Sequence, residues 1–365
     1  MSLHLYVLLE SVLSIASPLT LGVVGIVTFI AALTLGKLYF NGGYVPSNLL
    51  NHTNLNGKVA IVTGPSLGGI GFEAAAYLYS RGATVILGVR NVSNGDIVQQ
   101  EILKKYPKRN ASTLKVIALD LSDLQSVKSF VKTFKEQYDR VDLLLNNAGI
   151  MMTPYSTTKQ GVEIQFGTNH LGHFLLTYLL LNDIKQSNGR VINVSSRAGE
   201  HWVKGREETQ VVVDQSRHAL RGFSSFTLNT VQGDGKEIPS DRLYGRSKFA
   251  NMVFTKRLEK ELRKDPNTFA SAFSLHPGVV RTQLWRNLNP LYFLLVAPFW
   301  WFVTKDAWQG AQTSIYLCVA PKDQLKGGCY YADCKLDESE NKLAFDEELQ
   351  ERLWTTSLQL CQPFI

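Results

Sequence analysis

A short apolar strand pattern leads directly into a glycine-rich turn and then into a helical pattern. The strand covers residues 58–63, the turn 64–71 and the helix 72–81. Glycines let a backbone approach a ligand closely, and the first turn of a helix offers unpaired N–H groups and a positive dipole. In this order, the three segments predict a site for the pyrophosphate of a dinucleotide.

Strand and helix patterns continue to alternate along the chain. Strand patterns occupy residues 84–89, 113–119, 141–145 and 190–194, and helical patterns occupy 96–106 and 123–138. The strands are nearly continuous apolar runs, which is typical of parallel strands buried on both faces. We therefore expect an α/β fold, a doubly wound parallel sheet of Rossmann type in a single domain.

The residue after the second strand bears on the choice of cofactor. An acidic side chain there binds the 2′-hydroxyl of NAD, whereas an arginine suits the 2′-phosphate of NADP. Arg90 occupies this position, so the sequence favours NADP(H) over NAD(H). The alternative is that Arg90 is only a surface charge.

Tyr244 and Lys248 are four residues apart in a run of helix formers that ends near Arg263. Side chains at this spacing lie on one face of a helix. A fixed cation beside a phenol favours the phenolate and lowers its pKa, so Tyr244 could exchange a proton with a substrate oxygen. An isolated pair of this kind is usually only solvated, so the chemistry requires further partners.

The N-terminal segment differs from the rest of the chain. Between Glu10 and Lys37 there is no charged residue, and residues 18–36 are long enough to cross a hydrocarbon core of about 30 Å. A cleaved signal peptide is the alternative, but a basic n-region is missing. We expect a single-pass membrane anchor over 1–40 and a linker rich in Gly, Asn, Pro and Ser over 41–56. Lys37 follows the span, which places the remaining chain in the cytosol.

Charge and cysteine content exclude several classes of function. The formal charge of +7 is spread along the chain without a Lys/Arg block, so we expect no nucleic-acid partner. The four cysteines fit no metal motif, so we expect no metal, and they are too few for a disulfide framework. Such sparse thiols indicate a reducing compartment.

Seven motifs together resemble the short-chain dehydrogenase/reductase family over residues 56–331. They are the 63–71 turn, Asp120-Leu121-Ser122, Asn146-Asn147-Ala148-Gly149, Asn169 in TNHLGHF, the 194–199 stretch VSSRAG, Tyr244-Gly-Arg-Ser-Lys248, and the 276–282 stretch HPGVVRT. Within the family, the stretches FGTNHLGHF and HPGVVRT are most similar to the membrane-associated retinol dehydrogenase branch, whose members also carry N-terminal hydrophobic anchors.

The resemblance implies partners for Tyr244. Ser196 matches the serine whose hydroxyl binds the substrate oxygen, and its neighbour Ser195 is assigned a structural role. Asn169 matches the residue that kinks its helix and holds a water in a proton relay through Lys248. The implied reaction is hydride transfer between nicotinamide and a carbonyl carbon, with Tyr244 handling the proton.

The resemblance also implies the cofactor contacts. Asp120 lies beside the adenine, Thr282 near the nicotinamide carboxamide, and Lys248 on the ribose. The full predicted set is Gly64, Gly69, Ile70, Gly71, Arg90, Asp120, Leu121, Asn147, Ala148, Gly149, Tyr244, Lys248, Pro277, Gly278, Val280 and Thr282.

Several segments depart from the family pattern. The glycine turn has one extra residue, so Gly68 or Pro65 must bulge outward. An insertion of about residues 200–242 separates Ser196 from Tyr244. Residues 288–305 lie where the family builds its substrate lid, and their aromatic residues, including Trp300 and Trp301, suit a membrane interface. Residues 336–365 are expected to form a C-terminal helical tail.

These observations predict a membrane-anchored, NADP(H)-dependent oxidoreductase with its dehydrogenase domain over 57–335. The substrate is expected to be a lipophilic alcohol, aldehyde or ketone, such as a retinoid or steroid, and the membrane that of the endoplasmic reticulum. Two alternatives stay open: a dinucleotide sensor or scaffold without turnover, and a reductase of a conjugated double bond. A homodimer is also open, with a seam at a helix such as 160–181 or 242–263.

Overall fold

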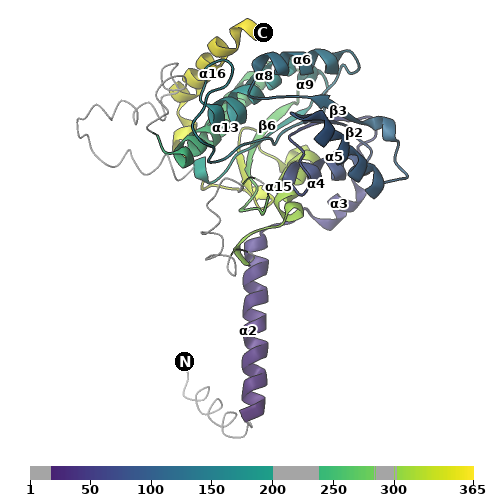
Figure 1. Ribbon diagram of the computed structural model, residues 1–365, viewed down its shortest axis with the longest axis vertical. Helices are drawn as coiled ribbons and strands as arrows, with labels where there is room; N and C mark the ends of the chain where they lie inside the picture. Colours follow the sequence, from purple (N-terminus) through teal and green to yellow (C-terminus); the bar gives the residue numbers. More distant parts are fainter. Residues whose placement is uncertain (1–17, 200–237, 283, 285–299, 301) are drawn as a thin grey trace, which may run out of the picture.

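An eight-stranded sheet in the order β3-β2-β1-β4-β5-β6-β7-β8 forms the centre of the computed structural model (Figure 1). The structure describes residues 18–199, 238–282, 284, 300 and 302–365. The strands are β1 (Val59–Thr63), β2 (Thr84–Val89), β3 (Leu114–Ala118), β4 (Leu143–Asn146), β5 (Arg190–Val194), β6 (Ser271–His276), β7 (Tyr330–Ala332) and β8 (Lys335–Leu336). All neighbours are parallel apart from β7 and β8. The predicted doubly wound sheet is confirmed.

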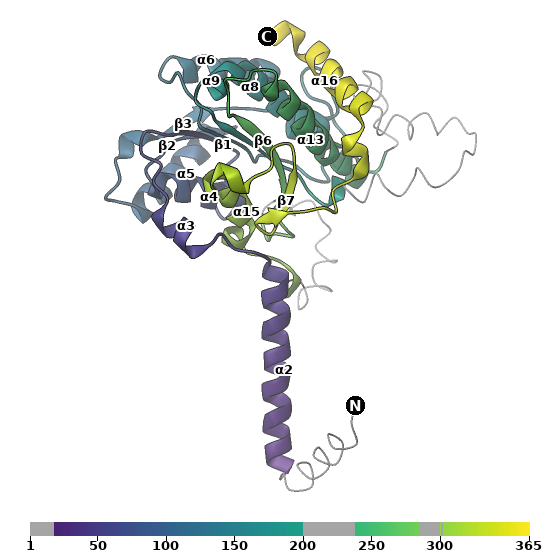
Figure 2. The same ribbon diagram turned by 180° about the vertical axis from the view of Figure 1, so that it is seen from behind.

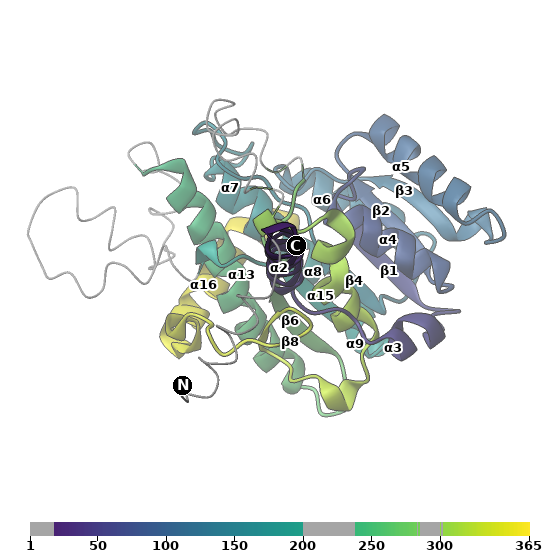
Figure 3. The same ribbon diagram turned by 90° about the horizontal axis from the view of Figure 1, so that it is seen from below.

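Helices cover both faces of this sheet (Figures 2 and 3). One face packs against α4 (Ile70–Ser80), α5 (Val92–Lys105) and α15 (Ala307–Val319). The other packs against α6 (Leu124–Lys135), α8 (Gly172–Leu179), α13 (Ser240–Arg263) and α16 (Glu347–Cys361). Shorter helices are α3 (Ser47–His52), α7 (Ile164–Phe166) and α9 (Leu181–Gln186). The sheet is therefore buried on both sides, which explains its apolar strands.

Local sequence sets the helix boundaries. α6 buries one stripe of apolar side chains, including Val127, Phe130 and Phe134, at the spacing of an amphipathic helix. Asp123 caps its start by accepting a hydrogen bond from the Gln125 N–H. α5 begins four residues earlier than the apolar pattern predicts, because the Asn91 side chain accepts a hydrogen bond from the Asn94 N–H and caps the helix.

The N-terminal helix α2 (Pro18–Asn41) projects away from the domain (Figure 1). Its Val24–Asn41 window has a mean hydropathy of 1.5 and is almost entirely unburied, as expected of a candidate membrane anchor. The following residues 41–56, predicted as a linker, pack on the domain. They contain α3, and Val45 and Leu55 are buried in the domain, because the apolar residues between the glycines and prolines pack against it.

The C-terminal tail forms the predicted helix, α16, and packs against α13. Its Trp354 ring lies 5.2 Å from Phe174 and 6.2 Å from Phe254, measured between ring centroids. The tail therefore covers parts of α8 and α13, the helices expected as a dimer seam. Residues 200–237 of the predicted insertion lie outside the described residues. So does most of the predicted lid, including Trp301.

Candidate active site

Two adjoining cavities lie at the carboxyl ends of the central strands, where ligands bind in open α/β sheets. The first has a volume of about 450 Å³ and the second about 400 Å³. Both are lined by Gly64, Ser66, Leu67, Ala148, Gly149 and Ile150. Together they form a two-lobed site that meets at the glycine turn.

The glycine turn absorbs its extra residue at Gly68. Gly68 has φ of +67°, and a Cβ added there would meet no atom within 4 Å, so this residue bulges outward. Gly69 caps α4 without any side-chain hydrogen bond, which leaves the N–H groups of the first helical turn facing the site. The predicted bulge at Gly68 is present, and the strand, turn and helix keep their expected arrangement.

Side chains behind the turn hold it in place. The Asn147 amide nitrogen donates to the carbonyl oxygens of Thr63, at 2.8 Å, and Gly64, at 3.3 Å. The Thr63 hydroxyl in turn accepts from the backbone N–H groups of Asn147 and Ala148, both at 3.0 Å. Sequence reasoning assigned Asn147 to the cofactor and overlooked Thr63, although Thr63 directly precedes the first glycine. Both residues join β1 to the loop after β4.

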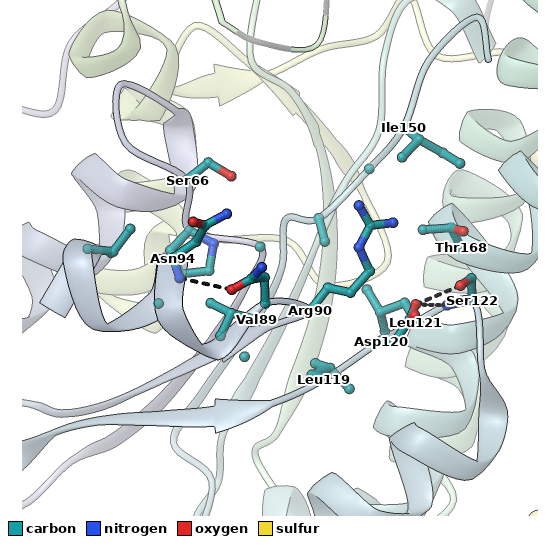
Figure 4. Close-up of a pocket in the computed structure, with 18 of the residues that line it drawn as sticks. Ser66, Val89, Arg90, Asn94, Leu119, Asp120, Leu121, Ser122, Ile150 and Thr168 are labelled. Atoms are coloured by element: carbon teal, nitrogen blue, oxygen red, sulfur yellow. Dashed lines mark hydrogen bonds between the residues drawn. The ribbon is translucent and has the colours of Figure 1, made fainter.

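Arg90 and Asp120 both line the first cavity, just after the neighbouring strands β2 and β3 (Figure 4). Arg90 is exposed, and no side chain in the described part of the chain pairs with it. The Asp120 carboxylate accepts hydrogen bonds from the Ser122 N–H and hydroxyl, at 2.9 and 2.6 Å. Ser66 and Asn94 also line this lobe. It therefore offers a cation, a carboxylate and neutral polar groups to a ligand.

The second cavity holds Ser196, Tyr244 and Lys248 together. Tyr244 and Lys248 are buried on α13, and Ser196 follows β5. The Ser196 hydroxyl lies near enough to the Tyr244 phenol to lower its pKa. Ser195 is turned away, and its hydroxyl donates to the Lys248 carbonyl oxygen at 2.6 Å. The pairing of a phenol with a serine hydroxyl in one cavity supplies the partner that the helix spacing alone left missing.

The electrostatics of this pair differ from the sequence expectation. Burial raises the pKa of Tyr244 to about 12, and the nearby Ser196 hydroxyl offsets only part of that rise. Burial also lowers the pKa of Lys248 to about 8, and its ammonium donates to the Val194 carbonyl oxygen at 2.9 Å. The pKa of Tyr244 is therefore raised and not lowered as expected, because desolvation of the phenolate outweighs the other effects.

Asn169 lies behind the cavity wall in a π-helical turn, Gly167–Leu171, between α7 and α8. Its side-chain oxygen accepts from the Ile150 N–H at 2.8 Å, and its nitrogen donates to the Ile150 carbonyl and the Ser247 hydroxyl, each at 2.9 Å. This turn interrupts the α-helical hydrogen bonding at the position where the kink is predicted. Both amide hydrogens are engaged with protein, however, so the side chain ties the loop at Ile150 to α13 and has no N–H to offer a relay water.

The loop after β6 forms the far wall of the second cavity, with Pro277, Gly278, Val280 and Thr282 in its lining. Gly278 has φ of +91°, a conformation that favours glycine. Apolar side chains line much of the remainder: Ile150, Met151, Met152, Ala198, Val279 and Leu284. Charged groups overlooked by sequence reasoning also line it. Arg197 pairs with Asp337 at 3.3 Å, and Asp241 lies one helical turn before Tyr244.

Comparisons with known proteins agree with this arrangement. A family model described as short chain dehydrogenase matches residues 58–225. Human retinol dehydrogenase 12 is 38% identical over 327 residues, covering 89% of this chain and 91% of that protein. Mouse retinol dehydrogenase 12 is 37% identical over the same coverage, and human retinol dehydrogenase 11 is 35% identical over 84% of this chain and 86% of that protein.

A solved structure of an uncharacterized protein from Mycobacterium paratuberculosis is similar across the whole domain. It has a TM-score of 0.63 and 28% identity, covering 86% of this chain and 97% of that one. Fold, motif order and sequence identity thus agree. The chain belongs to the short-chain dehydrogenase/reductase family, in its retinol dehydrogenase branch, and is an oxidoreductase whose fold binds a nicotinamide dinucleotide.

Proposed function

We propose that this protein uses NADP(H) to transfer a hydride between nicotinamide and the carbonyl or hydroxyl carbon of a lipophilic substrate. The observation that carries the proposal is the placement of Tyr244 and Ser196 together in the second cavity, beside Lys248 and a largely apolar wall. Retinoids, steroids and other lipid aldehydes or ketones have the required chemistry. The similarity to retinol dehydrogenases favours a retinoid.

The two-lobed site fits a dinucleotide by its shape and donors. A Cβ added to Gly64 would lie 2.7 Å from the Ala148 Cβ, and one added to Gly149 would lie 3.3 Å from both Asn169 Oδ1 and Lys248 Nζ. Glycine at these two positions therefore lets the loops pack closely where the lobes meet. Uncapped N–H groups of α4 suit the pyrophosphate there. When bound, the nicotinamide supplies or accepts the hydride.

Arg90 supports NADP(H) over NAD(H). Its guanidinium lies at the first lobe, directly after β2, where a 2′-phosphate on the adenosine ribose is expected. Arginine binds phosphate oxygens through several N–H groups in a fixed geometry. No acidic side chain occupies this position, since β2 ends at Val89 and Arg90 follows it.

The side chains have distinct parts in carbonyl reduction. The Ser196 and Tyr244 hydroxyls hold the substrate oxygen, and the Tyr244 phenol, kept protonated by burial, donates its proton to that oxygen as the carbon receives hydride. The Lys248 ammonium stabilises the phenolate that remains. Asn169 positions the loop at Ile150 and the helix α13. In the direction of alcohol oxidation, each transfer runs in reverse.

The membrane assignment completes the proposal. α2 anchors the protein, the catalytic domain faces the cytosol, and the endoplasmic reticulum is the expected membrane. A lipophilic substrate would then reach the second cavity from the bilayer rather than from water. The exposed apolar side chains of α2, among them Ile26, Phe29 and Leu35, support insertion of this helix.

Fluorescence titration of the detergent-solubilised protein with NADPH, and with NADH in parallel, tests the cofactor. Addition of all-trans-retinal then tests the reaction. We expect tighter binding of NADPH and its oxidation on addition of the aldehyde. Binding without oxidation of NADPH by retinal, a steroid ketone or another lipid ketone would favour a dinucleotide sensor. Oxidation only with a conjugated olefin would favour a double-bond reductase.

A further inference from the structure

The membrane helix packs against the catalytic domain at its last two turns. The Lys37 ammonium donates to the carbonyl oxygen of Thr304 at 2.5 Å. The Phe40 and Phe302 rings meet edge to face, with centroids 5.6 Å apart, and Gly36 leaves room for the Phe302 ring. These contacts join α2 to a segment more than 260 residues away in sequence, shortly before α15.

Two glycines after α2 continue this packing. A Cβ added to Gly42 would overlap the Asp333 carboxylate, and one added to Gly43 would overlap the Asp333 carbonyl group. Beyond them, the Val45 N–H donates to the Gln312 side-chain oxygen at 3.1 Å. The backbone after α2 is in direct contact with the backbone of the domain. The end of α2 is therefore held against the domain and is not joined to it by a flexible linker. We call this contact region the anchor joint: residues 36–45, 302–305 and 333.

Asp333 lies in a tight turn at the centre of the anchor joint. Asp333 and Cys334 connect the antiparallel strands β7 and β8 and have φ of +51° and +59°. The first position of such a hairpin turn suits glycine, asparagine or aspartate, so the turn fixes where the Asp333 side chain lies. The Asp333 carboxylate pairs with the Lys305 ammonium at 2.6 Å, and the Lys305 side chain is 5% exposed.

Lys305 links the anchor joint to the second cavity. The Lys305 backbone N–H donates to the Val279 carbonyl oxygen at 2.8 Å, and the Lys305 backbone carbonyl oxygen accepts from the Arg281 backbone N–H at 3.0 Å. Its side chain passes over Gly278, where an added Cβ would lie 2.7 Å from the Lys305 Cδ. The loop 277–282, which lines the cavity that holds Tyr244, is therefore supported from behind by a residue of the anchor joint.

We propose that the anchor joint positions loop 277–282 for the nicotinamide half of the cofactor, with Lys305 and Asp333 as its positioning residues. Docking of α2 through Gly43 fixes the position of the Asp333 backbone, Asp333 pairs with Lys305, and Lys305 supports the loop. The membrane anchor thus contributes to cofactor binding as well as to location. The inference rests on the proposed cofactor site, and it concerns the second lobe alone, because loop 277–282 lines the second cavity and not the first.

The test is a steric wedge in the anchor joint, Gly43→Ala, in the full-length protein in detergent. Two ligands distinguish binding at the two lobes. NADPH is expected to occupy both lobes, and adenosine 2′,5′-bisphosphate only the first. We expect the wedge to weaken NADPH binding about three- to tenfold, the equivalent of one net hydrogen bond, and to leave the bisphosphate unchanged. Gly25→Ala is the matched control, because a Cβ on that α2 glycine would meet nothing within 4 Å.

Asp333→Asn provides a second variant, which removes the charge facing Lys305 but keeps the side-chain shape, and the same selective loss is expected. Equal NADPH affinity in the Gly43→Ala and Gly25→Ala proteins would overturn the inference. So would parallel weakening of both ligands, which indicates general damage to the fold. Wild-type protein that binds the bisphosphate but not NADPH would overturn it while retaining the first lobe. Failure to bind either ligand would overturn the proposed cofactor as well.

Discussion

Replacement of Arg90 by alanine should convert the preference for NADPH into near indifference between the two cofactors. A hydrogen bond to a charged group contributes about 1.5–3 kcal/mol, and the exposure of Arg90 to solvent favours the lower end. A loss of about 1.5 kcal/mol raises the Kd for NADPH about tenfold. The Kd for NADH should not change, because it lacks the 2′-phosphate.

Fluorescence titration of both cofactors at one fixed ionic strength measures this difference, since salt screens an exposed ion pair. Arg352→Ala on α16 is a suitable control, because this arginine is also partly exposed and does not line either cavity. An equal loss of affinity for NADPH and NADH in Arg90→Ala would show that Arg90 maintains the structure of the first lobe and does not bind the 2′-phosphate. No change for either would reduce Arg90 to a surface charge.

Two further predictions follow from burial. Because the pKa of Lys248 is lowered to about 8, its ammonium is lost as the pH rises through that value, so kcat/KM for carbonyl reduction should fall above pH 8. Lys248→Met should have a low kcat/KM that does not decrease further above pH 8. A wild-type kcat/KM that stays constant above pH 8 would contradict the role assigned to the Lys248 ammonium. Trp354→Ala should lower the free energy of unfolding by about 3–5 kcal/mol, since the ring is buried against Phe174 and Arg257. Chemical unfolding measures this change, and the matched variant Phe269→Ala, at an exposed ring, should lower the free energy of unfolding by less than about 1 kcal/mol. Similar decreases for the two variants would contradict the packing of Trp354.

The sheet was predictable because its strands carry a local signal. Residues 84–89 and 190–194 are apolar, rich in β-branched residues and bounded by turns, and both strands have the predicted bounds. The same reason applies to the glycine turn and to the spacing of Tyr244 and Lys248. Each is contained within a few residues, so each was predictable from local sequence. Motif order then brought Ser196 to the same site.

Features that depend on contacts distant in sequence were not predictable. The raised pKa of Tyr244 comes from burial, which helix spacing does not reveal. The supposed linker packs on the domain because Gly43 meets Asp333, nearly 300 residues later. Asn169 carries a motif signal, yet only the folded chain reveals that its amide is engaged with Ile150 and Ser247. Such pairings arise from tertiary packing and leave no local pattern.

The central claim is that the Tyr244 hydroxyl transfers the proton in this active site. Turnover of NADPH with a lipophilic aldehyde, measured for wild-type protein and Tyr244→Phe at saturating cofactor, tests it most directly. The account predicts a loss of about 100- to 10,000-fold in rate, with NADPH affinity within about twofold of wild type. Retention of wild-type turnover by Tyr244→Phe would contradict it.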